Sequence, residues 1–200
     1  MRKITFIFVS LIFFVYFVPT NVKAYSSDPK QFISEIINQA KEILVKTNNK
    51  DFKSKKLAEI ALSTVDIKGI GFYTLGSFRK ELEPDDLEKY NLLFKDYFLK
   101  SFTSRLADYS DPKIEVLSSE TINPKYTIVK SLLLATDTRP EVKIDWRVYT
   151  KNPNEPLIRD VIIEGLSLAR TQKEEFASII QNNNGDISKL FLKLEEFINQ

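Results

Sequence analysis

The segment VKIDWRVY, residues 142–149, alternates apolar and polar side chains over its whole length. Val142, Ile144, Trp146 and Val148 fall on one face, and three charged residues and a tyrosine fall on the other. A period of two is typical of a β-strand in a sheet that buries one face. The segment therefore predicts a strand whose apolar face belongs to the interior.

Three neighbouring segments share this strand-like character. They cover residues 114–121, 126–135 and 157–166. Short stretches rich in Asn, Asp and Pro separate all four segments, and such residues favour turns. Consecutive strands with short connections pair as antiparallel neighbours, so we predict a four-stranded antiparallel sheet.

Helical patterns precede and follow the strands. Asp28-Pro29 is typical of a helix start and opens a helix to about Lys46; a second helix begins near Asp51, and Pro84 opens the longest one. The helical segments after the sheet are residues 171–181 and 186–199. This order of helices, strands and helices, with no linker, predicts a single α+β domain over residues 25–200.

The amino-acid composition removes several classes of chemistry. The 200 residues include no His and no Cys. Without them there is no Ser-His-Asp or Cys-His nucleophile, no Cys/His zinc site and no disulfide. Carboxylate chemistry or binding without catalysis remains.

The first 24 residues have the layout of a secretory signal peptide. Arg2 and Lys3 precede an apolar stretch over residues 4–18, and Pro19 and Ala24 follow it. This stretch of fifteen residues, interrupted only by Thr5 and Ser10, is shorter than the ~20 that a membrane-spanning helix needs. We therefore expect cleavage after Ala24, with an uncleaved anchor as the alternative. Export without disulfides indicates a bacterial periplasm.

The charge balance depends on this leader. The whole chain has 29 basic and 27 acidic residues, a formal charge of +2. Residues 1–24 carry three of the basic residues and no acid, so the remainder has 26 basic and 27 acidic residues. A net charge of −1 argues against nucleic acid as a partner.

Aromatic residues gather in one part of the chain. Of the 18 that follow residue 24, eight lie in the 31 residues from Phe72 to Phe102. A core helix accounts for such a pattern. One helix face of this bulk, opposite a narrow sheet, also predicts an internal gap that a ligand could fill.

Three segments resemble a known family. They are Tyr73-Thr74-Leu75-Gly76-Ser77-Phe78, the strand at 142–146, and the stretch DVIIEGLSL at residues 160–168. In these segments and their order the chain is similar to MlaC-type periplasmic phospholipid-binding proteins, also called toluene-tolerance auxiliary components of ABC transporters. The similarity extends over residues 25–200.

The resemblance implies a fold and a role. The fold is nuclear-transport-factor-like, with a curved antiparallel sheet and helices that enclose an apolar lipid cavity. The implied role is a monomeric, non-enzymatic carrier without cofactor or metal, whose cargo is phospholipid. Its implied partners are an outer-membrane lipoprotein–porin complex and an inner-membrane ABC lipid transporter, which together maintain outer-membrane lipid asymmetry.

The cavity implied by the resemblance gives a set of candidate lipid-binding residues. The helical candidates are Phe72, Leu75, Phe78, Phe94, Tyr97, Phe98 and Phe102. The sheet candidates are Val129, Leu132, Leu134, Ile144, Trp146, Val148, Val161 and Ile163.

Two acids in the third segment bear on a rival function. Asp160 and Glu164 are four residues apart, which on a strand places them on one face, as in a catalytic carboxylate pair. We favour structural roles: a cap or turn partner for Asp160, a pair with Arg147 or Lys143 for Glu164. Ser167 similarly fits a helix cap or a turn.

Several alternatives remain open from the sequence. Arg79 and Lys80 could attract a phosphate at the cavity mouth, although a solvated pair is commoner. A carrier of the same fold could hold another lipid such as a hopanoid. A secreted carboxylate-dependent hydrolase would show two acids across an open polar cleft, and an interaction module would have a filled core.

Overall fold

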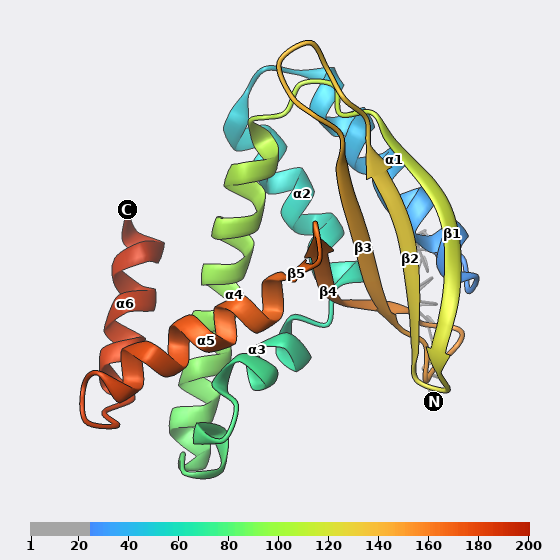
Figure 1. Ribbon diagram of the computed structural model, residues 1–200. Helices are drawn as coiled ribbons and strands as arrows, with labels where there is room; N and C mark the ends of the chain where they lie inside the picture. The colour runs from blue at the N-terminus through green and yellow to red at the C-terminus, as the bar shows by residue number, and fades with distance from the viewer. Residues whose placement is uncertain (1–24) are drawn as a thin grey trace, which may run out of the picture.

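The structure is a computed structural model that describes residues 25–200, so the predicted signal peptide lies outside the described residues. The described chain forms an antiparallel sheet with helices packed around it (Figure 1). The helices are α1 (Pro29–Lys46), α2 (Lys50–Thr64), α3 (Ile67–Leu75), a 3₁₀ turn η1 (Phe78–Lys80), α4 (Pro84–Ala107), α5 (Leu168–Gln181) and α6 (Ser188–Asn199). The strands are β1 (Ile114–Asn123), β2 (Tyr126–Leu133), β3 (Val142–Tyr149), β4 (Leu157–Ile163) and β5 (Leu166–Ser167). The predicted α+β class and the four main antiparallel strands are confirmed.

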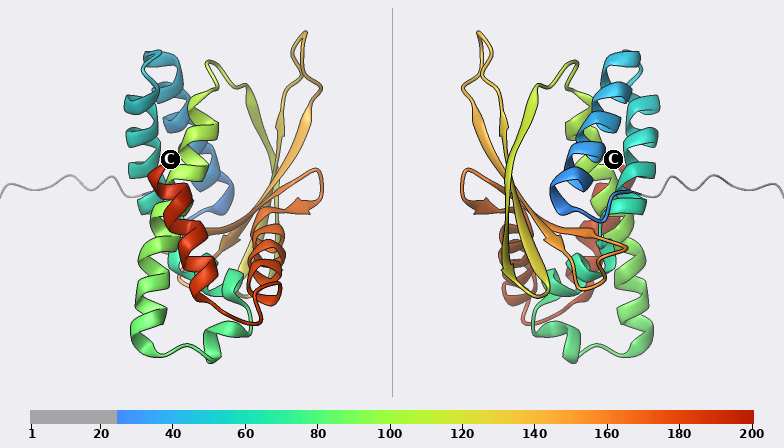
Figure 2. Two further views of the ribbon diagram at one scale, coloured as in Figure 1. Left: turned by 90° about the vertical axis from the view of Figure 1, so that its left-hand side faces the viewer. Right: turned by 90° about the vertical axis from the view of Figure 1, so that its right-hand side faces the viewer.

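The sheet has a simple order and one apolar face. The strands follow one another across it as β1-β2-β3-β4-β5, and all neighbours are antiparallel. Val129, Trp146 and Val161 stand directly opposite one another on β2, β3 and β4. Opposed residues project from the same face of a sheet, so this register builds the inner face. Figure 2 shows α1, α2 and α4 together on one side of the sheet.

The fourth strand is shorter than its pattern predicts. It ends at Ile163 because Glu164 (φ 49°) and Gly165 (φ 83°) form a tight turn, after which the chain returns as β5. A left-handed conformation is unfavourable for Glu. The Glu164 carboxylate compensates by accepting the backbone N–H of Lys143 at 2.5 Å, which fixes the turn against β3. This contact replaces the predicted side-chain pair with Arg147 or Lys143.

Caps define where the helices begin. Asp28 accepts the N–H of Gln31 at 2.8 Å and Pro84 is the first residue of α4, both as predicted. Helix α5 begins at Leu168, three residues earlier than its apolar period indicates. The reason is Ser167, whose Oγ accepts the N–H of Arg170 at 3.0 Å. The capping role predicted for Ser167 is confirmed.

A glycine allows α3 and α4 to approach closely. The ring of Phe94 on α4 lies against Gly71 on α3, and a Cβ built on Gly71 would be only 2.8 Å from Phe94 Cδ1. Phe94 is 2% exposed and belongs to the core cluster that α3, α4, α5 and α6 share. The glycine-rich segment therefore holds the aromatic helix in place.

Replacement of Gly71 by Ala tests this contact. Overpacking costs about 1–3 kcal/mol, against the gain of up to about 1 kcal/mol for Ala over Gly inside a helix. We expect Gly71→Ala to lower the urea midpoint of unfolding. Combined with Phe94→Leu, the loss should be smaller than the sum of the two single losses. A midpoint at or above that of the wild type in Gly71→Ala would show that the approach is not tight.

Candidate functional site

A cavity of about 500 Å³ lies between the inner face of the sheet and helices α1, α2, α4 and α5. The size falls within the roughly 300–1,000 Å³ typical of small-molecule sites. Aliphatic side chains of α1 and α2, aromatic side chains of α4 and the apolar face of the sheet form most of its wall. The cavity is thus built for an apolar ligand.

Eight of the predicted site residues line this cavity. They are Phe94, Tyr97, Phe98 and Phe102 on α4, Ile144 and Trp146 on β3, and Val161 and Ile163 on β4. The rings of Phe98 and Phe102 stack with their centroids 5.6 Å apart. The aromatic stretch of α4 is therefore partly core and partly cavity wall.

Four of the sheet residues that the sequence predicted for the cavity lie outside it, which is a correction. Val129 and Val148 are on the inner face, but they are fully buried in a cluster with Phe32 of α1. Leu132 pairs with Lys143 on the outer face, and Leu134 lies beyond the end of β2.

The neighbouring leucine of β2, Leu133, lines the cavity. Because a strand alternates its faces, a displacement of one residue exchanges inside for outside. The apolar run at residues 132–134 contains no polar residue that would have fixed the alternation.

The three candidates near α3 also lie outside the cavity. Leu75 is 1% exposed in the core between α3 and its neighbours, and Phe78 packs on the same cluster. Phe72 lies beneath the Lys68 ammonium, 5.6 Å from ring centroid to nitrogen. A helix presents only one stripe of its surface to a given neighbour. Of the α3 residues, Ile70 is the one that lines the cavity.

The first two helices contribute wall residues that the sequence interpretation missed. These are Ile36, Ile37, Ala40 and Leu44 on α1 and Leu57, Ile60 and Ala61 on α2. The three-and-four spacing of the α1 residues was visible in the sequence. Such spacing indicates a buried face, but it does not distinguish a packed core from the wall of a void.

The indole of Trp146 is held by a buried serine. Trp146 Nε1 donates to Ser131 Oγ at 2.9 Å, and that hydroxyl donates to the carbonyl of Ile144 at 2.9 Å. Ser131 is 2% exposed, so its position in the inner face would otherwise suit an apolar residue. The pair satisfies the indole N–H and fixes the ring in the cavity wall.

Polar groups of the cavity wall gather where α4 faces α5. We call them the polar rim: Tyr97, Ser101 and Arg105 on α4, and Thr171, Gln172 and Glu175 on α5. Tyr97 donates its hydroxyl to Gln172 Oε1 at 2.7 Å, and Gln172 Nε2 donates to Glu175 Oε2 at 3.0 Å. Burial, and then the negative charge of Glu175, raise the pKa of Tyr97, so its phenol remains a neutral donor near pH 7.

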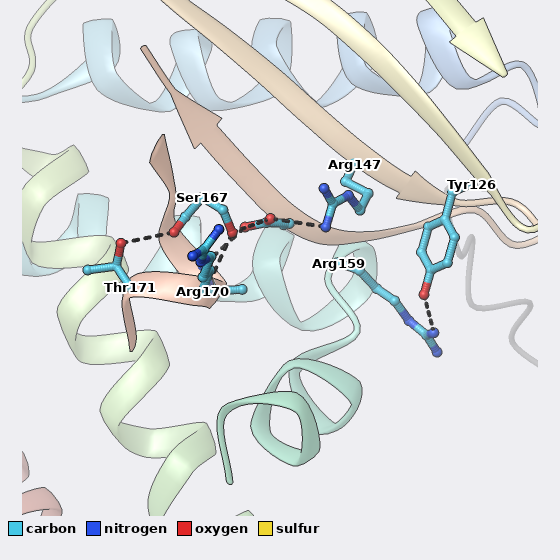
Figure 3. Close-up of polar contacts among 8 residues, drawn as sticks. Tyr126, Arg147, Arg159, Ser167, Arg170 and Thr171 are labelled. Carbon is cyan, nitrogen blue, oxygen red and sulfur yellow. Dashed lines mark hydrogen bonds and ion pairs between the residues drawn. The ribbon is translucent and has the colours of Figure 1, made fainter. Parts of the chain in front are cut away.

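Asp160 joins the sheet to α5. Its residue is 3% exposed, and its carboxylate accepts the Ser167 hydroxyl at 2.6 Å and the N–H of Ala169 at 3.1 Å. Arg147 on β3 pairs with the same carboxylate at 3.5 Å, and Thr171 donates to the carbonyl of Ser167 at 3.0 Å (Figure 3). The predicted role of Asp160 as a cap or turn partner is confirmed.

A second hollow of about 650 Å³ adjoins the cavity through Ile70, Asp160 and Ala169, which line both. Its charged lining residues are Arg79, Asp145, Arg147, Arg159 and Asp160. Arg79 therefore lines this second hollow and not the apolar cavity, which corrects the suggested place at the cavity mouth. Lys80 lines neither.

The charges of the second hollow are largely balanced within the protein. Arg159 donates to Asp66 and stacks on Tyr149. Arg159 also donates to the Tyr126 hydroxyl, and Arg147 is paired with Asp160 (Figure 3). Two of the three arginines that line the hollow are therefore neutralised by carboxylates of the protein.

Comparison with known proteins identifies the family. The family model described as MlaC protein matches residues 30–196. The chain belongs to the MlaC family. Its fold is also similar to a solved structure of the phospholipid-binding protein from Ralstonia solanacearum in complex with a phospholipid, with a TM-score of 0.72 at 20% sequence identity. That match covers 88% of this chain and 98% of the Ralstonia chain.

MlaC proteins are non-enzymatic, periplasmic lipid-binding carriers, and the two acids considered for catalysis fit that character. Asp160 is engaged by Ser167 and Ala169, whereas Glu164 accepts from the backbone of Lys143. They therefore have separate structural tasks and do not face each other across a cleft.

No helix within residues 25–200 is long and apolar enough to cross a membrane. The same residues contain no cluster of three or more His, Cys, Asp or Glu side chains suited to a metal ion.

Substitution of Asp160 tests its structural role. Asp160→Ala leaves the Ser167 hydroxyl and the Ala169 amide without their acceptor, and we expect a loss of about 2–4 kcal/mol in the free energy of unfolding. Asp160→Asn keeps one acceptor oxygen and should cost less. Glu174→Ala, an exposed acid on α5, is the control and should change stability by less than about 0.5 kcal/mol. Urea denaturation measures all three, and equal losses for Asp160→Ala and Glu174→Ala would exclude the role.

Proposed function

We propose that this protein is a periplasmic phospholipid carrier that moves lipid between an outer-membrane lipoprotein–porin complex and an inner-membrane ABC lipid transporter. The observation that carries the proposal is the apolar cavity of about 500 Å³ behind the aromatic face of α4. Family membership and the phospholipid bound to the Ralstonia protein support it. The transport serves to maintain outer-membrane lipid asymmetry, and one chain carries one lipid as a monomer.

The energetics of such a carrier favour reversible exchange. Burial of a methylene group is worth about 0.8 kcal/mol relative to water. A bilayer gives the acyl chains nearly the same apolar surroundings as the cavity. Transfer between membrane and cavity is therefore close to balanced, and the protein can both accept and release its cargo.

Export to the periplasm requires the predicted signal peptide at residues 1–24. Cleavage after Ala24 would place the new amino terminus at Tyr25, the first described residue. Tyr25 packs edge-on against Phe32, with ring centroids 5.7 Å apart, and donates its hydroxyl to Gln39 of α1. Cleavage at this position would thus leave Tyr25 and its contacts with α1 in the mature protein.

Lipid extraction is the direct test. Protein purified from the periplasm without detergent should contain about one diacyl lipid per chain, identified by mass spectrometry of an organic extract. Removal of the lipid should lower the melting temperature, because a ligand that binds only the native state stabilises it. A hopanoid in the extract would support a lipid carrier but contradict phospholipid as its cargo. An extract without lipid would refute the proposal.

A charge in the cavity wall gives a second test. Phe98→Asp places a carboxylate where acyl chains would lie, and we expect a folded protein that purifies without lipid. Leu92→Asp is the matched control, because Leu92 is on the same helix, 53% exposed and outside the cavity. It should keep its lipid. Loss of lipid from both variants, or from neither, would contradict the proposed binding site.

Val148→Asp distinguishes wall from core. Val148 is fully buried under α1 and does not line the cavity. An unpaired carboxylate at that position has no access to water, so its burial costs several kcal/mol, on the order of the whole stability of a domain. We expect Val148→Asp to be insoluble or unfolded by circular dichroism, whereas Phe98→Asp is folded.

A further inference from the structure

The polar rim contains two charged side chains of opposite sign. Among the charged residues of the cavity wall, Lys41 is paired with Asp111 at 3.4 Å and Asp160 is occupied by Ser167 and Ala169. Arg105 and Glu175 are the other two, and both are exposed. Within residues 25–200 neither of them forms an ion pair.

Both charges line the same cavity wall as the Tyr97 phenol. Tyr97, Ser101 and Arg105 are spaced by four residues and form one stripe on α4. On α5, the hydrogen bond from Gln172 orients one oxygen of Glu175 and leaves the other available. Burial is the main reason that the pKa of Tyr97 is raised. The charge of Glu175 raises this pKa further and the charge of Arg105 lowers it, so both charges act on the same hydroxyl. Arg105 and Glu175 do not form an ion pair with each other, so the guanidinium nitrogens and the carboxylate oxygens are more than 4 Å apart.

We propose that the polar rim binds the headgroup of a zwitterionic phospholipid, with its phosphate at Arg105 and its ammonium group at Glu175. This assignment rests on the proposed carrier function and names the class of cargo. A guanidinium group matches phosphate oxygens in geometry and charge, and a carboxylate accepts from an ammonium group. A phosphoethanolamine headgroup carries both charges, and the polar rim offers an opposite charge for each.

An anionic headgroup fits the rim less well. The phosphate of phosphatidylglycerol can also pair with Arg105, but this lipid has no cationic group to pair with Glu175. The carboxylate then opposes the net charge of the lipid. Both rim charges are exposed and screened by solvent, so the preference is a matter of a few-fold and decreases with salt.

A competition experiment tests the assignment. Delipidated full-length mature protein is incubated at low salt with vesicles of equal amounts of dioleoyl phosphatidylethanolamine and dioleoyl phosphatidylglycerol. The bound lipids are then quantified by mass spectrometry. We expect about threefold enrichment of the ethanolamine lipid in the wild type. Glu175→Gln should abolish this enrichment, whereas Arg105→Gln should preserve or increase it, because Glu175 then repels the anionic lipid without compensation.

Control variants make the result specific. Glu174→Gln removes the same charge from the adjacent position on α5, and Lys95→Gln removes a charge from α4 outside the cavity. Both should retain the wild-type ratio. A wild-type ratio of one, or an equal change in Glu174→Gln and Glu175→Gln, overturns the headgroup assignment but leaves the carrier intact. Absence of any bound lipid overturns the proposed function itself.

Discussion

The buried carboxylate of Asp160 ties the start of α5 to the sheet. A charge that is 3% exposed is stable only if its partners satisfy it. Arg147 supplies one partner from β3, while Ser167 and Ala169 supply two from the start of α5. The direction in which α5 leaves the sheet is therefore fixed. Because α5 carries half of the polar rim, the cavity depends on this contact as well.

The cavity arises because the helices fill only part of the inner face. Phe32 and Ile33 of α1 pack on Val129 and Val148, and that part of the sheet is closed. Over the rest, the rings of α4 contact one another along their own helix: the centroids of Phe94 and Phe98 are 6.2 Å apart, and those of Phe98 and Phe102 are 5.6 Å apart. Protein interiors normally leave few voids, and the atoms around a void lose packing contacts. Acyl chains would restore those contacts, which gives a physical reason for the cavity.

The sequence predicted elements better than it predicted the cavity wall. Asp28 and Pro84 marked helix starts because caps act within a few residues of the chain. The alternation in β3 predicted which of its side chains face inward. Leu132 was assigned to the wrong face because its apolar neighbours conceal the alternation, and Leu75 was assigned to the cavity because helical periodicity reports burial alone.

The sequence by itself determined which classes of catalytic chemistry are excluded and which local elements form. The absence of His and Cys removed most catalytic chemistry, and short-range patterns determined the order of helices and strands, because those effects need no distant partner. Tertiary structure alone decided that Val148 is core while Trp146 lines a cavity, although both face inward from one strand. It also decided that Arg105 and Glu175, seventy residues apart, share one rim. Both depend on how helices dock across the sheet, and docking is set by the shapes of surfaces that are remote from one another in the chain.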